Sequence, residues 1–135
     1  MVMKFNVKAE KQYYSNHPPA PWKEASSKFV DTLMRFTAGS AWSEYLNGKD
    51  VLELGAVECT YLPYLLTKGK PAHYLASDIF EDRYSAARNV LAERFKNLEF
   101  CVLRADKLGI PDNSFDTIMA FGLYHHLPDL LDAFR

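Results

Sequence analysis

The chain has 135 residues, enough for one domain with a shared core, and its 48% hydrophobic and 24% charged residues exclude disordered and fibrous classes. Sixteen lysines and arginines against seventeen acidic residues give a net charge of −1, which offers no electrostatic reason to expect a nucleic-acid partner. The chain also lacks a signal-peptide start, an apolar run of the roughly 20 residues that span a membrane, and a cysteine framework or metal-ligand spacing. We therefore expect a cytoplasmic protein that binds neither membranes nor metal ions.

The first third of the sequence predicts helices. Three prolines within residues 18–21 exclude a regular helix there. Residues 22–37 predict an amphipathic helix, and residues 41–46 a short helical turn. The apolar stripe expected on the first of these helices consists of Ala25, Phe29, Leu33 and Phe36, widened by Val30 and Met34. We interpret residues 1–48 as an N-terminal arm and helical extension of the core formed by residues 49–135, the two together forming one domain.

From residue 50 onward, strand and helix patterns alternate. Short apolar runs predict strands at 51–54, 74–77, 100–103 and 115–121, and helical periodicity predicts helices at 61–67, 83–95 and 130–135. This alternation is typical of an α/β domain with a parallel sheet. Right-handed crossovers are expected to place the helices on both faces of that sheet.

Acidic residues and glycines stand at the ends of the predicted strands. Glu53 and Gly55 close the first strand, Asp78 closes the second, and Asp106 follows the third. Open parallel sheets bind ligands beyond the carboxyl ends of their strands. Each position also has a purely structural interpretation, since Asp78 could cap the next helix and Glu53 could face solvent near a helix N-terminus. As an ordered set they favour a binding site.

The motifs resemble those of class I S-adenosylmethionine-dependent methyltransferases. Residues 51–56, Val-Leu-Glu-Leu-Gly-Ala, resemble the family's first motif, and residues 76–79 resemble its second-strand motif. Residues 105–116 are similar to the stretch that leads into its fourth strand, and residues 125–129, His-His-Leu-Pro-Asp, resemble the small-molecule branch. The resemblance covers residues 49–135. It implies a Rossmann-like sheet of order 3-2-1-4, S-adenosylmethionine as cofactor and methyl transfer to a small-molecule acceptor.

The resemblance also implies roles for individual residues. A carboxylate such as Asp78 can accept hydrogen bonds from both ribose hydroxyls. Asp106 is expected near the adenine amino group, and Glu53 is expected to orient the methionine end through neighbours or water. Gly55 permits close approach of the backbone because it has no Cβ. The complete predicted cofactor-binding set is Glu53, Gly55, Ala56, Asp78, Ile79, Ala105, Asp106 and Phe121.

Candidates for catalysis are fewer. His125 and His126 follow the fourth strand and are the candidate general bases, because histidine titrates near neutrality. The structural alternative, which we favour, is that both histidines order this loop beside Tyr124. The aromatic N-terminal residues either form a lid over the pocket or, as we expect, an arm packed on the sheet: Tyr13, Tyr14, His17 and Trp22.

Two features depart from the family pattern. The family's loop carries three alternating glycines, whereas here Val57 and Cys59 replace the second and third. The family's sheet has seven strands, whereas this chain supplies at most four and ends before the fold is complete. We therefore expect the fourth-strand edge to be covered by a second copy, another polypeptide or further residues. The alternatives are an inactive methyltransferase-like module that acts by assembly and, less favoured, a nicotinamide-binding Rossmann domain.

Overall fold

The computed structural model describes residues 7–17, 21–121 and 123. In chain order the elements are α1 (Val7–Asn16), α2 (Ser27–Ala38), the 3₁₀ helix η1 (Trp42–Tyr45), β1 (Asp50–Leu54), α3 (Leu62–Gly69), β2 (His73–Asp78), α4 (Glu81–Arg94), β3 (Leu98–Val102) and β4 (Thr117–Ala120). The predicted strands and the helices between them are present, with boundaries shifted by a few residues. The predicted helix at 130–135 lies outside the described residues.

The four strands form one parallel sheet of order β3-β2-β1-β4, which confirms the predicted α/β class and strand order. β1 lies at the centre between β2 and β4, and four of its five residues are buried, as expected for a strand covered on both sides. The chain lays down β1, β2 and β3 in one direction and then returns to place β4 on the other side of β1. The strand order therefore reverses at β1 and β4.

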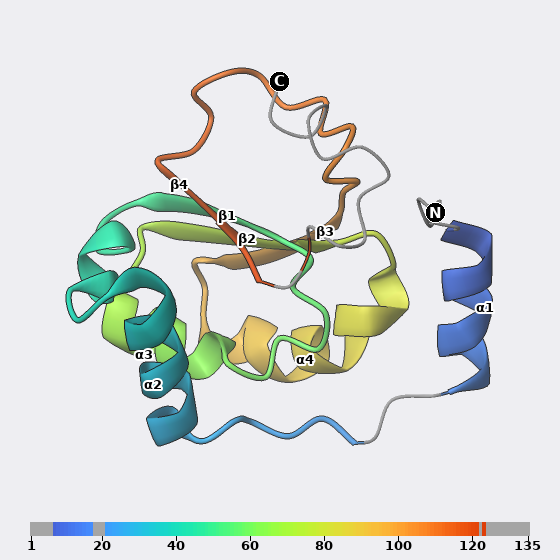
Figure 1. Cartoon of the computed structure of the whole chain (residues 1–135), viewed down its shortest axis with the longest axis horizontal. Coiled ribbons are helices and arrows are strands. Elements are labelled where there is room, and N and C mark those ends of the chain that lie inside the picture. Colours follow the sequence, from blue (N-terminus) through green and yellow to red (C-terminus); the bar gives the residue numbers. More distant parts are fainter. Residues whose placement is uncertain (1–6, 18–20, 122, 124–135) are drawn as a thin grey trace.

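The described helices that pack on the sheet lie on one face, so the expectation of helices on both faces is wrong for this part of the chain. Figure 1 shows α2, α3 and α4 below the sheet, while the connection of residues 103–116 rises above it without a helix. Right-handed crossovers explain why α3 and α4 share a face. Each of the steps from β1 to β2 and from β2 to β3 moves the same way across the sheet, so both connecting helices lie on the same side of it.

The helix predicted at 22–37 begins later, and the face that it buries differs from the predicted one. Ser26 is its N-cap and accepts a hydrogen bond from the Phe29 amide, so residues 22–25 remain extended. Val30 and Met34 are the residues of α2 that are buried, whereas Phe36 is 88% exposed and Phe29 is also exposed. The predicted stripe therefore had the wrong centre. Val30 and Met34 are four residues apart, and it is this row that faces the core.

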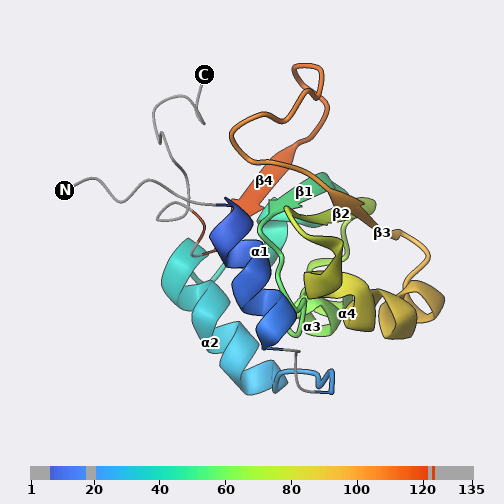
Figure 2. The same ribbon diagram turned by 90° about the vertical axis from the view of Figure 1, so that its right-hand side faces the viewer.

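α1 is a helix that the sequence pattern does not predict, because its polar and aromatic residues form no clear apolar face. Figure 1 shows it apart from the other helices, beyond the carboxyl ends of β1 and β2, and Figure 2 looks at the molecule from that side, with α1 in front. Tyr13 stacks on His17 with ring centroids 4.2 Å apart, and His17 Nδ1 lies 2.8 Å from the Tyr13 carbonyl oxygen. The helix thus occupies the side of the molecule where the candidate residues were expected.

One hydrophobic core joins α2 and η1 to the sheet and to the helices α3 and α4. Its largest fully buried side chains include Trp42, Leu46, Leu62, Leu65, Tyr74, Tyr84 and Leu91. β4 pairs with β1 on one side, and Ile118 of β4 is 60% exposed. In the described part of the chain, no helix combines the length and the apolar character that crossing a membrane requires.

Candidate functional site

The register of the sheet brings the predicted residues to one edge. Leu54 pairs with Ser77 on one side and with Ala120 on the other, so β1, β2 and β4 end level with one another. Asp78, the last residue of β2, therefore lies at the same edge as Gly55 and Phe121, which directly follow β1 and β4. This edge lies where the strand order reverses, the position at which open α/β sheets bind ligands.

The loop after β1 is hydrogen-bonded to the end of β2. The Val57 amide donates to Asp78 Oδ2 at 3.0 Å, and the Ala56 amide donates to the Ser77 carbonyl at 2.8 Å. Asp78 Oδ1 accepts from the Phe80 amide at 3.2 Å, and the Arg83 guanidinium lies 3.7 Å away. The side chain of Asp78 is 1% exposed. Asp78 thus holds the loop in position, and it is not the N-cap of α4, which is Phe80.

The loop keeps a glycine-like backbone without its glycines. Gly55 has φ +72°, and Val57 and Cys59 have φ +51° and +55°, in the left-handed region that disfavours residues with a Cβ. For a β-branched residue such as Val57 this conformation is a clear outlier. Cys59 is buried, and burial raises the pKa of its thiol. The substitutions at 57 and 59 therefore change side chains while the loop retains its left-handed turns.

Glu53 lies behind the loop in a closed polar cluster. Its side chain is fully buried, which excludes the solvent-facing interpretation, and it accepts hydrogen bonds from the hydroxyls of Tyr61 and Tyr74. Burial raises the pKa of Glu53 to about 7, although both tyrosine hydrogen bonds act in the opposite direction. Tyr61 stands just before α3, so the cluster connects β1, β2 and the end of the loop.

Asp106 forms a two-point ion pair with Arg104. Arg104 Nε lies 3.0 Å from Oδ1, and a terminal guanidinium nitrogen lies 2.8 Å from Oδ2. The hydrogen bonds from Arg104 hold the pKa of the Asp106 carboxyl below its usual range. Asp106 is therefore a charged acceptor near neutral pH, with its position set by a residue that the sequence reasoning did not include.

Apolar side chains line the mouth of the loop. The ring of Phe121 meets Tyr61 edge-on, with centroids 5.7 Å apart. Leu123 stands over Gly55, because a Cβ added to Gly55 would lie 3.0 Å from Leu123 Cδ1. These side chains lie next to the first turn of the loop, where Gly55 is half-buried.

The remaining predicted residues have simpler environments. Ala56 is buried, while Ile79 and Ala105 are half-buried. The candidate bases His125 and His126 lie outside the described residues. The sequence reasoning missed Tyr61, Tyr74 and Arg104, and only Arg104 left a local signal, since it stands two positions before an acid.

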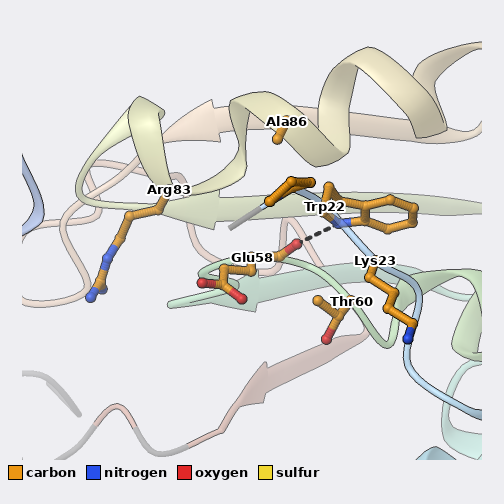
Figure 3. A pocket seen from close by; sticks show the side chains of 7 residues that line it. Trp22, Lys23, Glu58, Thr60, Arg83 and Ala86 are labelled. Carbon is orange, nitrogen blue, oxygen red and sulfur yellow. Dashed lines mark hydrogen bonds between the residues drawn. The ribbon is translucent and has the colours of Figure 1, made fainter. Parts of the chain in front are cut away.

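Residues 21–25, the part of the N-terminal arm that leads into α2, run along the outer side of the same loop, and the name arm is kept for them below. The Trp22 indole N–H donates to the Glu58 carbonyl at 2.8 Å, and the Ala25 amide donates to the Thr60 carbonyl at 2.9 Å. Figure 3 shows the indole between the loop and Ala86 of α4, while the Arg83 side chain runs away from it. A cavity of about 190 Å³ lies between these segments, lined by Pro21, Trp22, Lys23, Glu58, Thr60, Arg83 and Ala86.

A parallel sheet that reverses at β1, with acids and a left-handed loop at its carboxyl edge, defines a Rossmann-like α/β domain. The sequence profile of the family described as "Methyltransferase domain" matches residues 51–135. The chain therefore belongs to the methyltransferase domain family. A comparison with curated protein sequences found no match.

Solved structures share this fold. A SAM-dependent methyltransferase from Aquifex aeolicus is 24% identical with a TM-score of 0.60, covering 82% of this chain and 64% of that one. The YcgJ protein from Bacillus subtilis is 23% identical with a TM-score of 0.59, covering 78% and 43%. Phosphoethanolamine N-methyltransferase 1 from Haemonchus contortus, solved with phosphoethanolamine and S-adenosylhomocysteine, is 17% identical with a TM-score of 0.62, covering 87% and 25%. This chain thus spans between a quarter and two thirds of these proteins.

Family membership implies S-adenosylmethionine as the cofactor. Asp78 at the end of β2 and Asp106 in the loop after β3 are carboxylate acceptors, the kind of group that suits the hydroxyl and amino donors of an adenosyl ligand. Access to these residues is limited in this structure, because the Asp78 side chain is buried and Leu123 lies over Gly55. The two carboxylate acceptors therefore suit the cofactor, while Asp78 and Gly55 are covered by neighbouring residues in this structure.

Proposed function

We propose that this chain forms the S-adenosylmethionine-binding part of a methyltransferase that acts on a small molecule. One observation carries the proposal: in a chain of the methyltransferase domain family, the left-handed loop after β1 is hydrogen-bonded to Asp78 at the end of β2. This contact joins the two motifs whose spacing first indicated adenosyl binding.

The proposed binding roles follow from the contacts of each acid. The carboxylate of Asp78 accepts the Val57 and Phe80 amides and stands at the end of β2, where the proposal places the ribose hydroxyls. Asp106, kept ionised by Arg104, is suited to accept from the adenine amino group. Glu53 acts indirectly, since the Tyr61 hydroxyl that it binds also lies 3.4 Å from the Ala56 carbonyl oxygen of the loop.

The chemistry demands little covalent help from the protein. S-adenosylmethionine supplies an already activated methyl group, so the chain has to orient the reactants and exclude water. Phe121, Leu123 and Tyr61 provide an apolar surface beside the loop for that purpose. His125 and His126 remain the proposed general bases for an acceptor that must lose a proton.

The small-molecule class of the acceptor rests on the resemblance of residues 125–129 to that branch of the family. One solved relative of the fold acts on phosphoethanolamine, which agrees with a small acceptor but identifies none for this chain. The division into an arm and extension of residues 1–48 and a cofactor-binding core of residues 49–135 is part of the same proposal.

A second candidate function is an inactive methyltransferase-like module that acts by assembly. The observation in its favour is that Asp78 is closed off while the exposed Ile118 marks an apolar strand edge. The two functions differ in one measurable property, since only the first requires the cofactor to enter at the loop.

Calorimetric titration of the full chain with S-adenosylhomocysteine, with NAD as the control ligand, tests the proposal. We expect one-to-one binding of S-adenosylhomocysteine and none of NAD. Asp106→Asn should weaken binding by about tenfold or more, because a hydrogen bond to a charged acceptor contributes about 1.5–3 kcal/mol. Asp78→Asn should weaken it as well, and circular dichroism would verify that each variant is folded.

Asp112→Asn is the matched control, because Asp112 is an exposed acid in the turn before β4 and has no proposed contact with ligand. It should leave the affinity unchanged. A folded wild-type chain that ignores S-adenosylhomocysteine would refute cofactor binding and favour the assembly function. Equal losses in Asp106→Asn and Asp112→Asn would refute the assigned role of Asp106.

A further inference from the structure

The left-handed conformation of the loop of residues 55–59 is not explained by the residues of the loop itself. Val57 and Cys59 adopt left-handed φ values that cost free energy in any residue with a Cβ, and more in a β-branched one. Such conformations persist only where surrounding contacts over-determine them. Val57 is 37% exposed, so burial of its side chain is not the main contact that holds it.

Contacts hold the loop from both sides. On the inner side, Asp78 accepts the Val57 amide. On the outer side, the Trp22 indole donates to the carbonyl of Glu58, the residue between the two left-handed positions. The Ala25 amide then binds the Thr60 carbonyl, just beyond Cys59. The outer contacts come from a segment more than thirty positions earlier in the chain.

The arm is held by two further contacts, one within it and one directly after it. Glu24 pairs with Arg94 at the end of α4 at 3.1 Å, and Ser26 caps α2 immediately after Ala25. The indole of Trp22 packs against the hydrophobic core and lines the same cavity as Ala86 of α4 (Figure 3). Because the Trp22 side chain is already held in place, it loses little conformational entropy when it binds the Glu58 carbonyl. The hydrogen bond is therefore effective in restraining the loop.

From these contacts we infer that Trp22 is a positioning residue that keeps the loop of residues 55–59 in its left-handed, binding-competent shape in place of the missing glycines. The inference has two parts. The structural part concerns folding alone. The ligand part, which states that Trp22 raises cofactor affinity through the loop, rests on the proposed function.

A double-mutant cycle between Trp22→Phe and Val57→Gly tests the structural part. Phenylalanine retains an aromatic ring against Ala86 but lacks the N–H donor, and glycine adopts the left-handed conformation without steric cost. We expect Trp22→Phe to lower the urea midpoint of unfolding in the natural loop. In the Val57→Gly loop, the same change should cost less than half as much, because the restraint is no longer needed there.

Two controls isolate the cause. Trp42→Phe also removes an indole hydrogen bond, from Trp42 to Asp31 Oδ1 at 3.2 Å, but at a site away from the loop. Its cost should be the same in both loop backgrounds. Val57→Ala shortens the side chain but keeps a Cβ, so it should reproduce only part of the relief given by glycine.

The ligand part is measured by calorimetric titration of the same proteins with S-adenosylhomocysteine. Trp22→Phe should weaken binding roughly fivefold to tenfold, as expected for one neutral hydrogen bond, and Val57→Gly should restore most of that loss. Trp42→Phe leaves Trp22 as the sole tryptophan of the chain, so its fluorescence should change when the ligand binds.

The outcomes separate the two proposals. A cost of Trp22→Phe that is equal in both loops would overturn the inference, as would a Trp22→Phe protein that stays unfolded even with Val57→Gly. If no variant binds S-adenosylhomocysteine, the proposed function fails while the stability cycle still decides the structural part. If the wild type binds and Trp22→Phe binds equally well, the ligand part is wrong and the proposed function stands.

Discussion

The buried carboxyl of Glu53 should make folding stability depend on pH in a direction opposite to that of most acids. Burial raises its pKa in the folded protein to about 7, from an ordinary value of 4.5. Between these values the folded protein holds a proton that the unfolded chain has released. Stability from this group is therefore fully present below pH 4.5 and is lost as the pH rises through 7.

The magnitude follows from the size of that difference. The rise of the Glu53 pKa from 4.5 to about 7 corresponds to roughly 3 kcal/mol, of which about 2–3 kcal/mol falls between pH 5 and pH 8. Burial also raises the pKa of the Tyr61 and Tyr74 hydroxyls, so both stay protonated donors across this range. Glu53 is therefore the group of this cluster that titrates between pH 5 and pH 8.

Urea unfolding of the wild type and Glu53→Gln at pH 5 and pH 8 measures this effect. Glutamine carries no proton to release, so the wild type should lose about 2–3 kcal/mol more than the variant on going to pH 8. The comparison cancels the titration of the histidines, which both proteins share. Glu99→Gln, a change at an exposed position of β3, should leave the wild-type slope intact. Identical pH slopes for the wild type and Glu53→Gln would refute the reasoning.

Three further changes test other features of the fold. Ser26→Ala removes the N-cap of α2 and should cost about 1 kcal/mol in urea unfolding, so a change below about 0.3 kcal/mol would contradict the cap. Gly69→Ala places a Cβ 2.7 Å from Leu46 Cδ1 and should cost about 1–3 kcal/mol, whereas unchanged stability would show that this contact is looser than described. Ile118→Lys introduces a charge on β4 and should reduce any concentration-dependent association seen by sedimentation, with little change in the folding midpoint. Association that is equally strong in the Ile118→Lys variant would place the contact elsewhere.

The strands were predictable because their signals are local. Short apolar runs bounded by turn residues gave all four strands, and the resemblance of residues 51–116 to known motifs implied their order. The face that α2 turns to the core was not predictable in this way. Phe29 and Phe36 are as apolar as Val30 and Met34, and the packing of Trp42 and Leu46, not hydrophobicity alone, decides which row is buried.

The candidate site was predictable in position but not in its contacts. The strand ends gave the places of Gly55 and Asp78, because level parallel strands bring their ends to one edge, whereas Asp106 lies four residues beyond the end of β3. The tyrosines that bind Glu53 lie 8 and 21 positions away, and no spacing rule connects them to it. Whether the predicted residues bind the cofactor stays a prediction, which the titration with S-adenosylhomocysteine addresses.

The left-handed turns at Val57 and Cys59 show a further limit of motif reading. Glycine is the usual marker of such turns, and Val57 and Cys59 stand where the family pattern has it. The structure retains the turns because contacts with Asp78 and the N-terminal arm supply what the residues lack. Backbone shape at this point is a property of the surrounding fold.

The support that the arm gives to the loop has a consequence for how related sequences vary. Where a relative has glycine at the positions of Val57 and Cys59, the turn forms unaided, and the position of Trp22 is free to change. Where a relative lacks those glycines, it needs an N–H donor on the arm. The two segments, 35 positions apart between Trp22 and Val57, should therefore covary, and a family alignment that shows them varying independently would count against their interdependence.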